Sequence, residues 1–67
     1  MKKKYNIAVD FATFNQVLKE VKRHAKVTQI LEQIGVISIE ADDAQLKFIK
    51  KVKGVLSVEE DRQNKIQ

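Results

Sequence analysis

The stretch Gly54–Gln67, with the sequence GVLSVEEDRQNKIQ, decides the fold that we expect for this chain. Its first residue, a glycine, fits the left-handed position just past the end of a helix. The segment from Val55 to Glu59 or Glu60 is then a short apolar strand, with Leu56 and Val58 in phase toward a core. Acids close this strand, and residues 62–67 form a polar tail with nothing to bury. We therefore expect the preceding chain to form a domain that includes this segment as its last strand and from which the tail extends.

Three earlier segments have the composition and the alternation of strands. Residues 5–11 alternate between apolar and other side chains. Their apolar members, which share one face of the strand, are Tyr5, Ile7, Val9 and Phe11. Residues 27–34 are rich in aliphatic side chains, and residues 36–41 alternate again. Because only Gly35 separates the last two segments, we predict a tight hairpin or a bulged turn between them.

The pattern of the second predicted strand leaves its buried face open. Ile30 and Ile34 share one face, and Val27 and Leu31 share the other. Only one of these pairs can face the core of a two-layer domain. The uncovered face would then carry an aliphatic patch, either of Ile30, Ile34 and Val36 or of Leu31 and Val36, and such a patch favours a protein partner or self-association.

Two segments have helical periodicity. The first covers about residues 14–25 and starts after Thr13, which forms a capping-box pattern with Gln16. The second follows Asp42 and Asp43, which cap and charge its start. The apolar stripe of the second helix consists of Ala44, Leu46, Phe48, Ile49 and Val52.

The order strand, helix, strand, strand, helix, strand predicts an α+β fold of two layers. Each strand has one apolar face and each helix one apolar stripe, so both helices should cover the same face of a four-stranded antiparallel sheet. With right-handed crossovers this is the ferredoxin-like βαββαβ arrangement. We expect a single domain over residues 1–67, with an ordered core at about residues 4–61 and a tail at 62–67.

Length and composition narrow the class of protein. A chain of 67 residues forms one small core, and the absence of cysteine excludes a disulfide or a thiolate metal site. After the basic start, Asn6 and Asp10 interrupt the apolar run that a signal peptide would need. No window of the sequence approaches the ~20 apolar residues of a membrane helix. We therefore expect a cytoplasmic protein without a membrane partner.

No pattern indicates catalysis, a cofactor or a metal. His24 is the only histidine, and no nucleophile or acid lies at a telling spacing from it. The consecutive carboxylates Glu59–Asp61 alternate between the faces of a strand, so they do not converge on a cation. We expect a protein that is not an enzyme and that needs no cofactor.

Nucleic acid is the main rival to a protein partner, because the formal net charge is +4 and both helices expose basic residues. These are Lys19, Lys22, Arg23, Lys26, Lys47, Lys50, Lys51 and Lys53. RNA readers of this fold stack bases on aromatic residues of the open sheet face. We expect Phe11, Phe14 and Phe48 to face the core, which leaves only Tyr5 as an aromatic residue for the open sheet face. Weak binding of nucleic acid through the helices is therefore only the alternative.

Several short motifs between Lys26 and Asp61 carry a family resemblance. They are Lys26-Val27, Ile37-Ser38-Ile39, Leu46 and Ile49 in the acid-opened helix, and above all Val55-x-x-Val58-Glu59-Glu60-Asp61. In these motifs, which cover about half of the chain, the sequence resembles the propeptides of subtilisin-like serine proteases and the small free-standing inhibitors built on the same domain. The family has a βαββαβ fold, which agrees with the pattern of elements.

The resemblance also implies a partner and a site. In this family the open sheet face docks on the protease, an acid near the turn between strands two and three caps protease surface helices, and the tail enters the cleft as product. By this likeness the tail Asn64–Gln67 would occupy the substrate subsites, with Gln67 at the cleavage-site pocket. The partner-binding residues that we expect are Glu32, Val36, Ser38, Glu59, Asp61, Asn64, Lys65, Ile66 and Gln67.

The resulting prediction is a small protein-binding module, either a serine protease inhibitor or an intramolecular-chaperone-like factor. The partner would be a protein such as a subtilisin-like serine protease, and the chain would be a monomer or a weak homodimer. The alternatives are a partner-binding or self-associating module of another role and the weak binding of nucleic acid described above.

Overall fold

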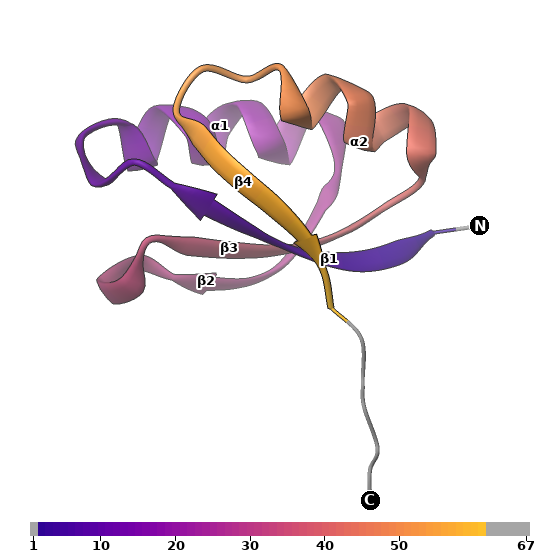
Figure 1. Ribbon diagram of the computed structural model, residues 1–67, viewed down its shortest axis with the longest axis horizontal. Coiled ribbons are helices and arrows are strands. Elements are labelled where there is room, and N and C mark those ends of the chain that lie inside the picture. The colour runs from indigo at the N-terminus through magenta and orange to yellow at the C-terminus, as the bar shows by residue number, and fades with distance from the viewer. Residues whose placement is uncertain (1, 62–67) are drawn as a thin grey trace, which may run out of the picture.

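Four strands form one sheet in the computed structural model, which describes residues 2–61 (Figure 1). In chain order they are β1 (Lys3–Val9), β2 (Lys26–Leu31), β3 (Val36–Ala41) and β4 (Val55–Glu60). All neighbouring pairs are antiparallel, and the order across the sheet is β2-β3-β1-β4. The strands β1 and β3 are therefore central, and β2 and β4 are edges.

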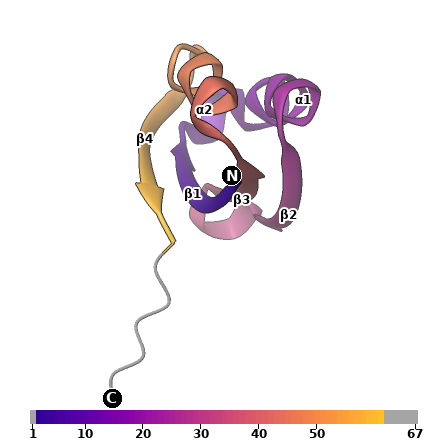
Figure 2. The ribbon, with the colours of Figure 1, turned by 90° about the vertical axis from the view of Figure 1, so that its right-hand side faces the viewer.

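Two helices, α1 (Phe14–His24) and α2 (Asp43–Lys50), lie on the same face of the sheet (Figure 2). Within residues 2–61 no helix covers the opposite face. The element order and the strand order together confirm the predicted ferredoxin-like α+β fold. Neither helix of the described chain is long and apolar enough to span a bilayer.

The core fills the space between the helices and the two central strands. The central strands show the predicted alternation, and the pairing of Ile7 with Ile37 and of Tyr5 with Ile39 joins their buried side chains. The buried residues are Tyr5, Ile7, Val9, Phe14, Val17, Val21, Ala25, Ile37, Ile39, Ala41 and Ile49. Burying an aliphatic side chain contributes roughly 1.5–3 kcal/mol, so this cluster is the main source of stability.

The start of α2 forms as predicted. The Asp42 carboxylate accepts a hydrogen bond from the Gln45 backbone N–H at 2.8 Å. In return, Gln45 Oε1 accepts from the Asp42 N–H at 2.9 Å, which completes a capping box. A cap of this kind stabilises a helix by about 1 kcal/mol, which matters for a helix of only 8 residues.

The start of α1 differs from the prediction. Thr13 occupies the N-cap position but its side chain makes no capping hydrogen bond. Instead, Asp10 Oδ1 accepts from the Ala12 N–H at 3.1 Å and begins a 3₁₀ turn, η1 (Phe11–Thr13), ahead of the helix. Strand β1 consequently ends at Val9, and Phe11, which we expected on the core face, is 64% exposed.

Gly54 makes a close packing contact that no other residue could make. Its φ is +102°, so the predicted positive φ is confirmed, although a turn separates it from the end of α2 at Lys50. A Cβ at this position would collide with the side chains of Thr13 and Val17. The glycine therefore lets the chain pass close to α1 before β4 begins.

Strand β2 contains one extra residue, which resolves its open face assignment. Val27 pairs with Ile39 and Gln29 pairs with Ser38, so Thr28 is bulged out of the ladder. Because paired residues share a face, Val27 and Ile30 both lie on the helix-covered side, and Leu31 lies on the open side. Neither of the two predicted pairings is correct. Ile34 lies beyond the strand, in the 3₁₀ turn η2 (Glu32–Ile34).

Strand β4 contains a similar irregularity. Val55 pairs with Val9 and Ser57 pairs with Ala8, so Leu56 is the extra residue. Val55 and Val58 pack against the core, whereas Leu56 is 68% exposed. The predicted core position of Leu56 is therefore wrong, and that of Val58 is confirmed.

Candidate binding surfaces

The uncovered side of the sheet, here called the open sheet face, carries its side chains in three rows across the strands. The first row is charged and consists of Lys26, Glu40 and Lys4. The second is polar and consists of Gln29, Ser38, Asn6 and Glu59. The third is apolar or small and consists of Leu31, Val36, Ala8 and Ser57. The polarity of this face therefore falls from the Lys4 end of β1 toward its Val9 end.

A hydrogen bond fixes the centre of this face. Ser38 Oγ donates to Asn6 Oδ1 at 2.7 Å, and both side chains are partly buried. On its other side Asn6 pairs with Glu59 of β4. The bond orients the Asn6 amide, so the middle row presents a defined set of donors and acceptors to a partner.

The structure brings together three of the predicted partner-binding residues. Val36, Ser38 and Glu59 all lie on the open sheet face. Asp61 follows β4 directly, and its backbone N–H donates to the Lys4 carbonyl at 2.8 Å. Asn6, Gln29 and Leu31 belong to the same surface but are not among the predicted partner-binding residues. For Gln29 and Leu31 the reason is the bulge at Thr28, which sets the β2 residues that face outward.

Glu32 lies apart from the other predicted acids. It is exposed in η2, in the connection between β2 and β3, near the turn at which the family resemblance implies an acid. Glu59 and Asp61 belong to the opposite edge of the sheet, because β4 is separated from β2 by three inter-strand spacings, or about 14 Å. The predicted tail residues Asn64, Lys65, Ile66 and Gln67 lie outside the described residues.

An apolar surface surrounds η2. Ile30 is 43% exposed and Ile34 is 65% exposed. They line a shallow depression of about 400 Å³ together with Leu31, Glu32 and Gln33. The predicted aliphatic patch therefore exists, but it lies around the turn as well as on the open sheet face.

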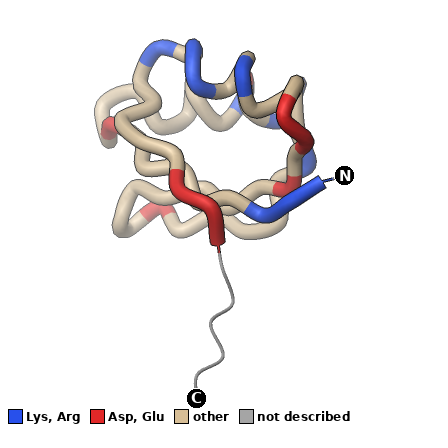
Figure 3. Tube along the Cα trace, turned by 45° about the vertical axis from the view of Figure 1, so that its right-hand side comes forward, with Lys and Arg blue, Asp and Glu red and all other residues tan. Residues whose placement is uncertain are grey.

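The outer surface of residues 14–24 and 43–54, here called the helical face, is strongly basic. It has seven Lys or Arg and only two acids, Glu20 and Asp43. The other described residues have four Lys and seven acids. Figure 3 shows this separation, with much of the blue along the helices and red at the end of β4. The two layers of the molecule thus carry opposite net charge.

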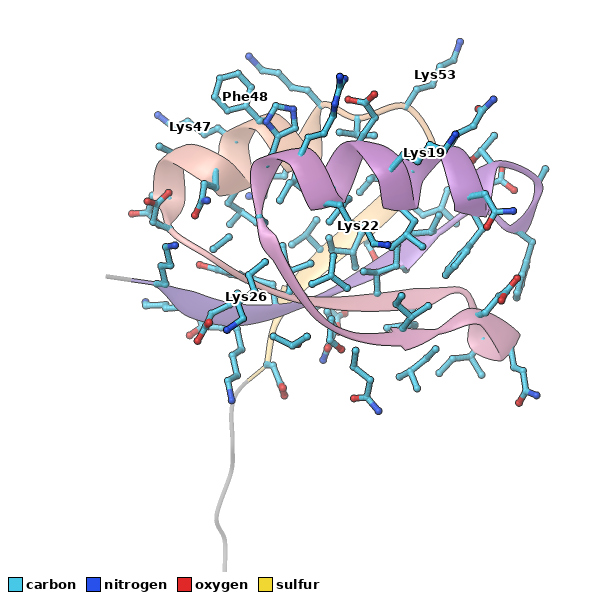
Figure 4. All side chains as sticks on the ribbon, turned by 180° about the vertical axis from the view of Figure 1, so that it is seen from behind. Lys19, Lys22, Lys26, Lys47, Phe48 and Lys53 are labelled. Atoms are coloured by element: carbon cyan, nitrogen blue, oxygen red, sulfur yellow. The ribbon has the colours of Figure 1, made fainter. Side chains whose placement is uncertain are left out.

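Phe48 lies on the helical face, which corrects its predicted place in the core. Its side chain is 58% exposed, and only Ile49 of α2 is fully buried. The Phe48 ring stacks on His24 of α1, with ring centroids 5.3 Å apart and an interplanar angle of 6°. Phe14 of α1 is buried, so Phe48 is the largely exposed phenylalanine of α1 and α2 (Figure 4).

The sole histidine is thus in a ring contact between the helices. Among residues 2–61 no group of three or more His, Cys, Asp or Glu is placed to hold a metal ion. No buried side-chain nitrogen or oxygen in that part of the chain lacks a hydrogen-bond partner.

No family model matches the chain, and no curated protein matches it either.

Proposed function

We propose that this protein is a binding module whose open sheet face docks on a protein partner, and that the partner is a subtilisin-like serine protease. The observation that carries the proposal is the uncovered sheet face with its ordered rows of side chains. The motif resemblance of residues 26–61 supports the choice of partner. In that role the protein acts as an inhibitor or as a folding assistant of the protease.

The two ends of the open sheet face suit two kinds of contact. At the η2 end, Leu31 and Val36 offer apolar area next to the exposed Ile34 and the acid Glu32. At the other end, β4 is an edge strand and leads into the chain beyond Asp61. An extended segment that follows an edge strand can add main-chain hydrogen bonds to a partner, with side chains at alternate positions filling pockets.

The experiment is an inhibition titration of a subtilisin-like protease with a chromogenic peptide substrate. We expect inhibition by the full chain, and loss of at least about tenfold in affinity for Val36→Arg, because an unpaired charge would enter the interface. Ala44→Arg is the matched control, since it adds the same side chain to an exposed position of α2 and should leave inhibition unchanged.

A second variant, lacking residues 63–67, tests the contribution of the tail. The family resemblance predicts that its inhibition is weaker than that of the full chain. No inhibition by the full chain at micromolar concentration contradicts the inhibitor role, and equal effects of the two arginine variants contradict docking through the open sheet face.

A further inference from the structure

We propose that the helical face is a second binding site, and that its ligand is single-stranded nucleic acid. This site is on the opposite side of the molecule from the open sheet face and is independent of the protease proposal. Three features of the described residues carry it: an excess of cations, an exposed aromatic ring held in place by a stack, and a depression between the helices and the turn before β4.

The charge of the helical face is complementary to a phosphate backbone. Seven cations stand against Glu20 and Asp43, and Glu20 is paired with Arg23 at 3.7 Å. The remaining cations are distributed along both helices (Figure 4). Helix α1, with 11 residues, is ~16 Å long at 1.5 Å per residue. The cations therefore extend over a length at which several phosphates of one strand could be contacted.

Phe48 adds an exposed aromatic ring to the helical face, which a basic surface that is only solvated would not have. One side of its ring is stacked on His24, so the ring is held at the junction of α1 and α2 and is 58% exposed. A nucleobase that stacks on the exposed ring would extend an existing stack. Base stacking on an aromatic side chain does not depend on base identity, so the site should tolerate any sequence.

A depression elsewhere on the helical face offers a place for the backbone of the ligand. Lys19 of α1 and Lys53, in the turn that leads to β4, line one depression of about 310 Å³ together with Gln16, Glu20 and Val52. A phosphate between Lys19 and Lys53 would be near both ammonium groups. Phe48 lies toward the other end of α1, so the two features mark a path along the helices (Figure 4).

The same features argue against the two other polyanions. Paired bases in a duplex cannot stack on Phe48, because only unstacked bases expose their faces. A membrane surface would need several apolar side chains among the lysines. Of the large hydrophobic side chains that are exposed, Phe11, Ile30, Ile34 and Leu56 lie elsewhere, and only Phe48 lies on the helical face.

The test is fluorescence anisotropy with a labelled oligothymidylate of about 12 nucleotides, a length within the range that single-strand binding folds occupy. We expect binding at about 50 mM salt that weakens steeply by about 200 mM, because bound phosphates release counterions. A duplex of the same length and vesicles of phosphatidylserine and phosphatidylcholine are the competing ligands, and both should bind more weakly.

Matched variants separate stacking from general charge. Phe48→Ala should weaken binding about tenfold through loss of base stacking, whereas Phe11→Ala, also an exposed phenylalanine, should not. Phe48→Leu keeps apolar bulk without the ring and should behave like Phe48→Ala. The double change Lys19→Gln with Lys53→Gln should weaken binding more than Lys2→Gln with Lys4→Gln, which removes the same charge elsewhere.

Each other outcome overturns the proposal. Absence of oligothymidylate binding at low salt excludes the site. Equal affinities of Phe48→Ala and Phe11→Ala, or of the two lysine pairs, leave only general attraction to polyanions. Tighter binding to the duplex or to the vesicles than to the single strand assigns the helical face to one of those ligands instead.

Discussion

The two central strands and the two edge strands of this sheet differ in how strictly they keep their register. From Tyr5 to Val9 in β1 and throughout β3 every second residue is buried, and the pairing between the two strands has no interruption. In β2 and β4 one residue each, Thr28 and Leu56, is bulged. A central strand is held by neighbours on both sides, so an extra residue there would break two ladders. An edge strand has only one neighbour, and a bulge costs less.

We expect the largest effect from the removal of one residue from each kind of strand. Deletion of Asn6 from β1 should abolish cooperative folding, because Tyr5 and Ile7 can no longer share the core face. Deletion of Leu56 from β4 should leave a folded protein within about 1 kcal/mol of the parent, because it restores regular pairing of Val55 and Ser57 with β1. Thermal unfolding followed by circular dichroism measures both.

Comparable losses in the two deletions would show that the edges are as strictly registered as the centre. A folded Asn6 deletion would show that β1 itself can accommodate a shift. In either case the contrast between central and edge strands would have to be abandoned.

A smaller effect is expected from truncating two isoleucines that face each other across β3 and β2. Ile37 is fully buried and Ile30 is 43% exposed, although both lie on the helix-covered side. Ile37→Ala should cost roughly 2–5 kcal/mol, since it leaves a cavity in the core. Ile30→Ala should cost about 1 kcal/mol, since less area is lost from burial.

Urea denaturation of the two alanine variants gives these free energies, provided that the dependence on urea concentration is the same in both. A cost for Ile30→Ala equal to that of Ile37→Ala would mean that β2 is packed as tightly as the central strands.

The smallest effect distinguishes two positions within β4. Leu56→Thr should change the free energy of unfolding by no more than about 0.5 kcal/mol, because the side chain is 68% exposed. Val58→Thr has nearly the same shape as the parent but buries a hydroxyl against the core, and should cost about 1–3 kcal/mol. The reverse order of the two costs would contradict the bulge at Leu56 and restore a regular strand.

The same contrast explains which parts of the fold could be predicted from the sequence. Alternation in residues 5–9 and 36–41 follows from a two-residue period, which is reliable where a strand has two neighbours. The Asp42 cap is a local interaction between a side chain and a backbone group three residues on, so it is also visible in the sequence. The bulges are not, because no residue type is required at Thr28 or Leu56.

The candidate surfaces could be predicted only where they depend on such local patterns of the sequence. Ser38 and Val36 belong to a regular strand and were placed correctly on the open sheet face. Phe48 was assigned to the core because it has the spacing of the apolar stripe in α2. That helix has only 8 residues and buries Ile49 alone, so the ring meets His24 of the neighbouring helix instead. The spacing of apolar residues within α2 alone cannot reveal a contact that depends on the position of α1.

The segregation of charge between the two layers gives the molecule a permanent electric dipole that runs between the sheet layer and the helical layer. Residues of the helical face sum to +5, and the other described residues sum to −3. In the field of a negatively charged surface such a molecule would turn before it makes contact, with its helices toward the surface. The open sheet face would then point into solution, so adsorption by one layer would leave the other free for its own partner.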